Sequence, residues 1–162
     1  MSDHLPRVIQ TGEITGYRIW YVHNGELKGT YQRTYIWNPG INVTKLPPST
    51  KPDFKKVMWQ ENEQQNVEQK NDEWWGAGFH AFKKIDKTYD YFTFCCGKHF
   101  TWAFGRIYMW GDVIETRHGY RSSHATIQSI DFLHPGAHPN LTALEILHPK
   151  YYDKFINQPY PE

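Results

Sequence analysis

The stretch RIYMWGDVIETRHGYRSSHA, residues 106–125, decides the fold of this 162-residue chain. Its first half is rich in aromatic and β-branched residues, which are typical of strands. Gly111 interrupts this pattern and predicts a kink or a bulge. Residues 117–119 predict a turn, and a second strand follows from Tyr120. The stretch therefore predicts a central β-hairpin, with Trp110 and Tyr120 as packing anchors.

Further patterns predict more strands and a sharp turn. Residues 14–23 alternate in the manner of a strand whose two faces are both partly covered. Asn24-Gly25 is the strongest short hairpin signal in the chain. A second strand-like run extends from Leu27 to Trp37, so residues 14–37 are expected to form a β-hairpin. A long apolar run over residues 100–115 supplies another strand.

The middle of the chain predicts one helix and one polar segment. Ile85, Tyr89 and Phe92 recur at helical spacing, with Lys and Asp between them. This spacing predicts a short amphipathic helix over residues 84–94, lying on the sheet. Residues 60–73 are rich in Gln, Asn and Glu and predict a mobile polar excursion from the domain.

The C-terminal part predicts a second short helix. Asn140 is suited to cap a helix over residues 141–148, and a further capped turn is expected after Pro149. Together with the strands, these elements predict one α+β domain over residues 1–162. It consists of a curled, barrel-like antiparallel sheet with one amphipathic helix and a short C-terminal helix.

The composition limits the partners and the compartment. Lys and Arg total 18 and Asp and Glu total 17, so the net charge of +1 provides no overall attraction to nucleic acid or to an anionic membrane. The sequence has no apolar run of about 18 residues, the length that a membrane span requires. It begins without a secretion signal, and the adjacent Cys95 and Cys96 do not make a disulfide framework. We therefore expect a cytoplasmic protein.

The triplet Gly-Tyr-Arg occurs twice, at residues 16–18 and 119–121. An Arg side chain offers a planar fork to carboxylates, phosphates and base edges, and aromatic residues, 17% of this chain, supply stacking planes. We predict a ligand-binding sheet face made of Arg18, Trp20, Trp75, His80, Trp110, Tyr120 and Arg121. The alternative is that Arg18 and Arg121 brace the sheet, by packing on Trp rings and pairing with nearby carboxylates.

Four residues of the central hairpin support a different hypothesis. His118, His124, Asp112 and Glu115 are of types that bind metal ions, and they lie close together in the sequence. They would make the chain a small metal-assisted hydrolase or nuclease. Against this, strand alternation directs Asp112 and Glu115 to opposite faces, and the histidines lie at turns.

Four sequence blocks occur in a fixed order: GYRIW (16–20), WNPG (37–40), GAGFHAFKK (76–84) and GRIYMWGDVIETRHGYRSSHA (105–125). In this order the chain resembles a group of small, largely uncharacterised bacterial and phage-associated proteins. Many members carry cysteines after the second block and before the third, at a spacing typical of a metal clip. Here NVTKLPP and EWWGAG stand at these places, so the resemblance implies that aromatic packing replaces the clip. It implies a shared fold and brings no established activity.

These observations predict a non-enzymatic binding module that recognises a protein, nucleotide or nucleic-acid partner without a cofactor. The resemblance implies a phage-encoded protein that interacts with its host, for example one that blocks a defence system. The metal-assisted hydrolase or nuclease stays open as the alternative. Whether Arg18 and Arg121 face a pocket or the interior of the sheet decides how the binding hypothesis develops.

Overall fold

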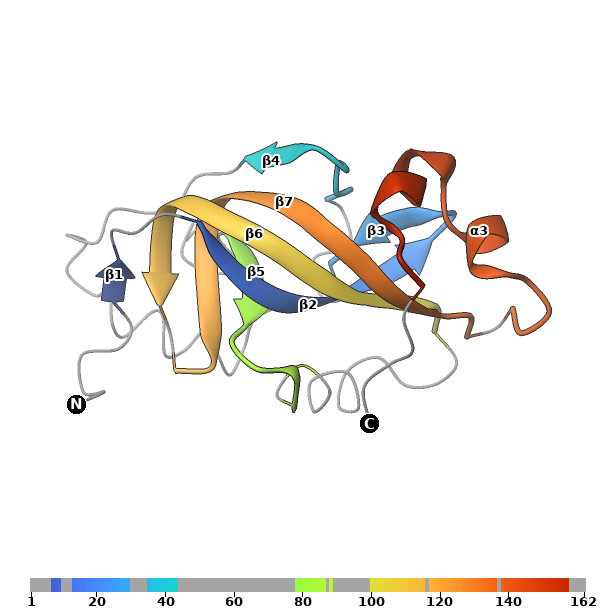
Figure 1. Cartoon of the computed structure of the whole chain (residues 1–162), viewed down its shortest axis with the longest axis horizontal. Coiled ribbons are helices and arrows are strands. Elements are labelled where there is room, and N and C mark those ends of the chain that lie inside the picture. Colours follow the sequence, from blue (N-terminus) through green and yellow to red (C-terminus); the bar gives the residue numbers. More distant parts are fainter. Residues whose placement is uncertain are drawn as a thin grey trace, which may run out of the picture.

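The fold is an antiparallel sheet accompanied by a few short helical segments (Figure 1). The computed structural model describes residues 7–9, 13–29, 35–43, 78–86, 88, 100–115, 117–136 and 138–157. The strands are β1 (Arg7–Ile9), β2 (Ile14–His23), β3 (Glu26–Lys28), β4 (Ile41–Val43), β5 (Phe79–Phe82), β6 (Trp102–Glu115) and β7 (Gly119–His134). The excursion expected at residues 60–73, as well as Trp75, Cys95 and Cys96, lies outside the described residues.

Strands β6 and β7 form the central hairpin that the sequence predicts. Their register contains twelve residue pairs, from Trp102↔His134 to Glu115↔Tyr120. The register shifts between Trp110 and Val113, where Gly111 has a φ of 83°. A left-handed backbone of this kind is accessible to Gly at little cost, and it lets β6 bulge without breaking the hairpin. The bulge predicted at Gly111 is therefore confirmed.

The predicted turn at Asn24-Gly25 joins β2 to β3. Both residues have positive φ values, 52° and 80°, as a two-residue hairpin turn requires. The strand expected to continue to Trp37 is wrong, because β3 ends at Lys28. Ile36 instead bridges back to Lys28 in the antiparallel direction, and the Trp37 amide donates to the Leu27 carbonyl at 2.9 Å.

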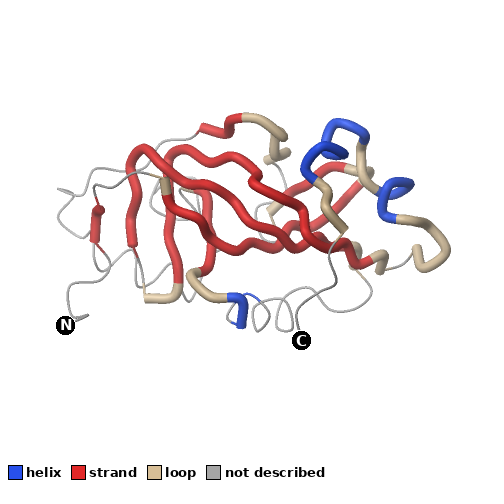
Figure 2. Tube along the Cα trace, viewed as in Figure 1, coloured by secondary structure: helices blue, strands red, loops and turns tan. Residues whose placement is uncertain are grey.

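The pairings run from β6 through β2, β5 and β7 and back to β6. β6 pairs with β2 through eight residues, β2 meets β5 at Tyr17↔Phe82, β5 pairs with β7, and β7 pairs with β6. The sheet is accordingly curled, and Figure 2 shows its long strands bending together. β1 extends the sheet beside β6, and β4 pairs with β7 next to β5.

The largest core cluster lies on one side of this sheet. It contains Trp20, Ile107, Met109, Ala125 and Ile127, which are all fully buried. We call this side the inner face and the opposite side the outer face. The same cluster includes three residues that other segments bring to it, namely Trp37, Leu147 and Tyr151. Because buried aromatic rings remove about 150–250 Å² each from water, Trp20, Trp37 and Tyr151 dominate the apolar contribution to stability.

The C-terminal segment packs on one end of the inner face. Helix α3 (Ala143–Ile146) begins at Thr142, whose side chain and Glu145 form a capping box. The prediction of Asn140 as the cap is wrong, because a capping box needs Ser or Thr followed three residues later by Glu, and only Thr142 meets that requirement. A 3-10 helix, η1 (Pro149–Lys154), follows, which confirms the predicted turn after Pro149, and His148 is its cap.

The helix predicted over residues 84–94 is described only at its start. Ile85, Asp86 and Thr88 are helical, and the Thr88 amide donates to the Lys84 carbonyl at 3.3 Å. Ile85 packs against a second buried cluster, Ile19, Trp102 and Phe104, on the outer face. The remainder lies outside the described residues. In the described ranges, no helix has the length and apolarity that crossing a bilayer requires.

Candidate ligand-binding site

The two Gly-Tyr-Arg triplets lie on either side of β5, and their glycines contact the same residue. A Cβ on Gly16 would stand 2.4 Å from the Ala81 Cβ, and a Cβ on Gly119 would stand 2.1 Å from the Ala81 carbonyl oxygen. Both distances are too short for any side chain, so only Gly lets β2 and β7 approach β5 this closely. The repeated triplet thus reflects one shared neighbour, and it brings Arg18 and Arg121 to the same part of the sheet.

Arg18 lies on the inner face, two residues from Trp20 along β2. Its guanidinium carbon lies 4.7 Å from the ring centre of Trp37 and 5.9 Å from that of Trp20. Its Nη1 donates to the backbone carbonyl of His80 at 2.9 Å. The two Trp rings meet edge to face at 5.6 Å, so they present Arg18 with an aromatic wall.

Arg121 lies deeper than Arg18. It pairs with His80 of β5 and Ile114 of β6, and only 4% of its surface is exposed. Because Arg121 and His80 are directly paired, their side chains project to the same side of the sheet. Burial lowers the pKa of Arg121, and the positive charge of Arg18 lowers it further. The guanidinium groups of Arg18 and Arg121 are therefore close enough to repel each other.

His80 is linked to both arginines. Its backbone carbonyl accepts from Arg18, and it pairs with Arg121 across the strands. Burial, followed by the charge of Arg18, lowers its pKa to about 3. The imidazole is therefore neutral at physiological pH and offers one hydrogen-bond donor and one acceptor. The site thus combines two cationic forks, one neutral imidazole and an aromatic wall.

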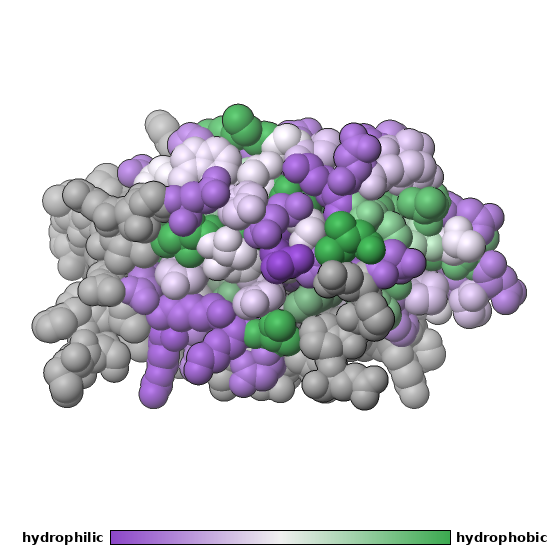
Figure 3. Space-filling view, in the orientation of Figure 1, coloured by the Kyte–Doolittle hydropathy of each residue, from purple (hydrophilic) through white to green (hydrophobic). Residues whose placement is uncertain are grey.

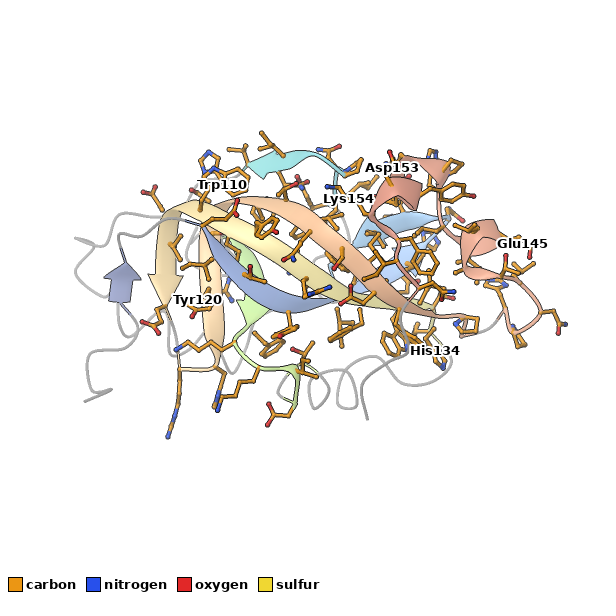
Figure 4. The ribbon with its side chains drawn as sticks, in the orientation of Figure 1. Trp110, Tyr120, His134, Glu145, Asp153 and Lys154 are labelled. Atoms are coloured by element: carbon orange, nitrogen blue, oxygen red, sulfur yellow. The ribbon has the colours of Figure 1, made fainter. Side chains whose placement is uncertain are left out.

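The structure brings only part of the predicted face together. Arg18, Trp20, His80 and Arg121 are neighbours, although Trp20 is fully buried and forms part of the wall. Trp110 lies on the outer face, where its ring is 5.6 Å from that of His124. Tyr120 packs near Lys83, whose Nζ lies 5.5 Å from the ring centre. Figure 4 shows Trp110 and Tyr120 well apart, and Trp75 lies outside the described residues.

Sequence reasoning missed Trp37, which supplies the ring closest to Arg18. Trp37 packs at 5.0 Å from Phe79, and Tyr35 lies 5.5 Å from Phe79. The Tyr35 hydroxyl donates to the Asn42 Oδ1 at 2.7 Å, and Asn42 is fully buried. Trp37 stands in the WNPG block, but its contact with Arg18 joins two segments 19 positions apart, which strand alternation does not predict.

The four residues of the metal hypothesis are all described and remain separate. Glu115 binds the Lys83 ammonium at 2.7 Å, and His124 Nδ1 lies 2.7 Å from the Ser123 Oγ. His118 lies at an exposed bend. Within the ranges that the structure describes, no three His, Cys, Asp or Glu side chains form a group able to hold a metal ion. The metal-assisted alternative therefore has no ligand set in this hairpin.

A groove of about 650 Å³ lies elsewhere, between the β2–β3 turn and the C-terminal segment. Its lining includes His23, Thr101, His138, Glu145 and His148. None of the predicted binding residues contributes to it, so it is separate from the arginine site.

Comparisons of the chain with protein-family models, with curated proteins and with solved structures find no match.

Proposed function

We propose that the protein is a non-enzymatic binding module that receives an anionic group at Arg18 and Arg121. The arginine site, as we name it, consists of Arg18, Trp37, His80 and Arg121. The observation that carries the proposal is the closeness of two guanidinium groups to His80: Arg18 donates to the His80 carbonyl, Arg121 pairs with His80, and the charge of Arg18 lowers the pKa of both His80 and Arg121.

The chemistry of the site favours a phosphate or a carboxylate. A phosphate or carboxylate placed between two guanidinium groups offsets their mutual repulsion, and Arg forks bind such groups in a bidentate manner. The neutral His80 ring adds a hydrogen-bond donor without adding a third positive charge. Trp37 holds one face of Arg18 and thereby limits the orientations of its fork.

The burial of Arg121 favours a small ligand over a broad one. With 4% of its surface exposed, Arg121 is accessible to a single projecting group and not to a flat protein face or a duplex backbone. Arg18 keeps partial exposure and would meet the ligand first. The proposal treats the ring of β6, β2, β5 and β7 as a small barrel-like enclosure around the site. Of the partners predicted from the sequence, a nucleotide is therefore favoured.

The setting of this function rests on the resemblance alone. The motif blocks resemble phage-associated proteins, and we extend the proposal to a host-interaction role in which the module binds an anionic molecule of a defence system.

The test is a calorimetric titration with inorganic phosphate, a nucleoside monophosphate, a dicarboxylate and a single-stranded oligonucleotide. We expect the monophosphate to bind, and Arg121→Gln to weaken it by at least tenfold, the loss of about 1.4 kcal/mol expected for a charged hydrogen bond. Arg18→Lys keeps the charge, removes the fork and should weaken binding less. Arg117→Gln changes the same charge at an exposed bend and should leave binding unchanged.

Two results would oppose the proposal. One is the absence of binding by all four probes to a folded protein. The other is an equal loss of binding in Arg117→Gln and Arg121→Gln, since that would indicate general charge attraction rather than a built site.

A further inference from the structure

Six residues of β4, β7 and β6 form two rows across the outer face. One row is Val43, His124 and Trp110, because Val43 pairs with His124 and His124 pairs with Trp110. The second row joins Ile41 to Thr126 and Thr126 to Tyr108 in the same way. Directly paired residues of neighbouring strands project to the same side of a sheet. We call these residues the outer patch: Ile41, Val43, Tyr108, Trp110, His124 and Thr126.

The outer patch exposes apolar side chains that the fold holds in place. Ile41 is 63% exposed and Val43 is 58% exposed, whereas Asn42 between them is fully buried. The Asn42 side chain accepts from the Tyr35 hydroxyl at 2.7 Å and from a backbone amide at 2.8 Å, and it donates to three backbone carbonyls. Turning β4 over would bury Ile41 and Val43 but would break all these bonds inside the protein.

The figures agree with this arrangement. Figure 3 shows hydrophobic residues at the upper edge of the molecule, over β4, and Figure 4 places Trp110 beside that strand. Exposed apolar surface of this kind, with aromatic residues beside it, is typical of sites of association between proteins.

The charges near the outer patch differ in sign at its two ends. The patch itself contains no Lys, Arg, Asp or Glu. Glu13 is exposed and precedes Ile14, which pairs with Met109, so it lies beyond the Trp110 end. Arg106 lies beyond the Tyr108 end, and its side chain keeps 31% exposure while it binds Asp131 at 3.2 Å.

We propose that the outer patch binds a second copy of this chain, in a two-fold symmetric dimer that packs sheet against sheet. If the two-fold axis runs across the strands, the Glu13 end of one copy lies near the Arg106 end of the other. The net charge of +1 gives little long-range repulsion between copies. Single-stranded nucleic acid fits less well, because the patch has aromatic rings but no cation of its own to hold phosphates.

The size of the patch sets the strength of the dimer. Stable interfaces use about 20–30 residues on each side, and the outer patch supplies far fewer. The dimer is therefore weak and reversible, with a dissociation constant on the order of tens of micromolar.

Sedimentation velocity over roughly 10 to 500 micromolar protein tests this proposal. We expect the apparent mass to rise from 19.2 kDa towards twice that value as the concentration increases. Val43→Glu and Ile41→Lys each place a charge in the patch and should raise the dissociation constant at least tenfold. Leu144→Glu is the matched control, because Leu144 is 47% exposed on α3, outside the patch. It should leave dimerisation unchanged.

Each contrary result has a distinct meaning. A wild-type chain that stays at 19.2 kDa at the highest concentration overturns the dimer. If the monomeric chain then shows quenching of Trp fluorescence by an oligonucleotide, and Val43→Glu removes it, the patch is a nucleic-acid surface instead. Equal loss of dimer in Leu144→Glu and Val43→Glu also contradicts the proposal. Thermal unfolding of each variant confirms that it is folded.

Discussion

The two parts of β7, one paired with β5 and the other with β4, carry the opposite of what simple burial predicts. Where β7 pairs with β5, Arg121 is only 4% exposed. On the outer face, His124 and Thr126 lie next to the exposed Ile41 and Val43 of β4. A charge is enclosed and aliphatic groups are open to solvent. A fold selected for stability alone would avoid both, and this is why we propose a binding role for each region.

The largest expected effect is a difference in unfolding free energy between a core substitution and a substitution on the outer patch. Trp37→Ala removes a fully buried ring that contacts Trp20, Phe79 and Arg18. It should lower the free energy of unfolding by about 3–5 kcal/mol. Ile41→Ala, at a position that is 63% exposed, should change it by less than about 0.5 kcal/mol. Urea denaturation measures both, and similar losses would mean that the inner face is not the core.

A second prediction sharpens the account of the repeated triplet. Gly16→Ala should destabilise by about 1–3 kcal/mol, because its new Cβ meets the Ala81 Cβ. Ala81→Gly removes that Cβ, so the double variant should recover most of the loss. Gly119→Ala meets the Ala81 carbonyl oxygen, which belongs to the backbone, and Ala81→Gly should not rescue it. Rescue of both variants, or of neither, would contradict the packing described for β5.

The third prediction concerns pH. The pKa of His80 is about 3 in the folded protein, below its usual 6.5, so between these values the unfolded chain binds a proton that the folded chain does not. His80 therefore stabilises the fold above pH 6.5, and this contribution is lost as the pH falls towards 3. The loss has a slope of at most about 1.4 kcal/mol per pH unit. His80→Gln should reduce the slope of unfolding free energy between pH 7 and 5, and an unchanged slope would show that His80 remains accessible to protons.

The smallest effect lies in the C-terminal segment that covers one end of the inner face. Thr142→Ala removes the hydroxyl that accepts from the Glu145 amide and should cost about 1 kcal/mol. Asn140→Ala should cost almost nothing, because Asn140 does not cap α3. Paired thermal unfolding measurements test this, and the reverse order would restore Asn140 as the cap.

Sequence patterns predicted the parts of the fold that depend on neighbouring residues. The hairpin at residues 106–125, the bulge at Gly111 and the turn at Asn24-Gly25 each follow from local backbone preferences, and the structure confirms them. Long-range contacts were not predictable in this way. The strand expected to end at Trp37 was wrong, because the pairing of Lys28 with Ile36 is decided by tertiary packing rather than by strand propensity.

The candidate site, too, was predictable only where it depends on local sequence. Arg18 and Arg121 were found because a repeated triplet is visible in the sequence. That both glycines adjoin Ala81, and that Trp37 supplies the aromatic wall, required the register of β5 between β2 and β7. Trp110 was predicted on the same face as Arg18, but the alternation of β6 places it on the outer face, opposite Arg18 and Trp20. A one-residue change of phase is enough to move a side chain across a sheet.

The most direct test of the central claim is an NMR titration of the arginine Nε–Hε signals with inorganic phosphate and with a nucleoside monophosphate. Specific binding at the arginine site predicts saturable shifts of the Arg18 and Arg121 signals, with little change at Arg106 and Arg117. If the exposed Arg117 shifts as much as Arg121, or if Arg18 and Arg121 do not move while the protein stays folded, the two arginines only brace the sheet and the binding proposal is wrong.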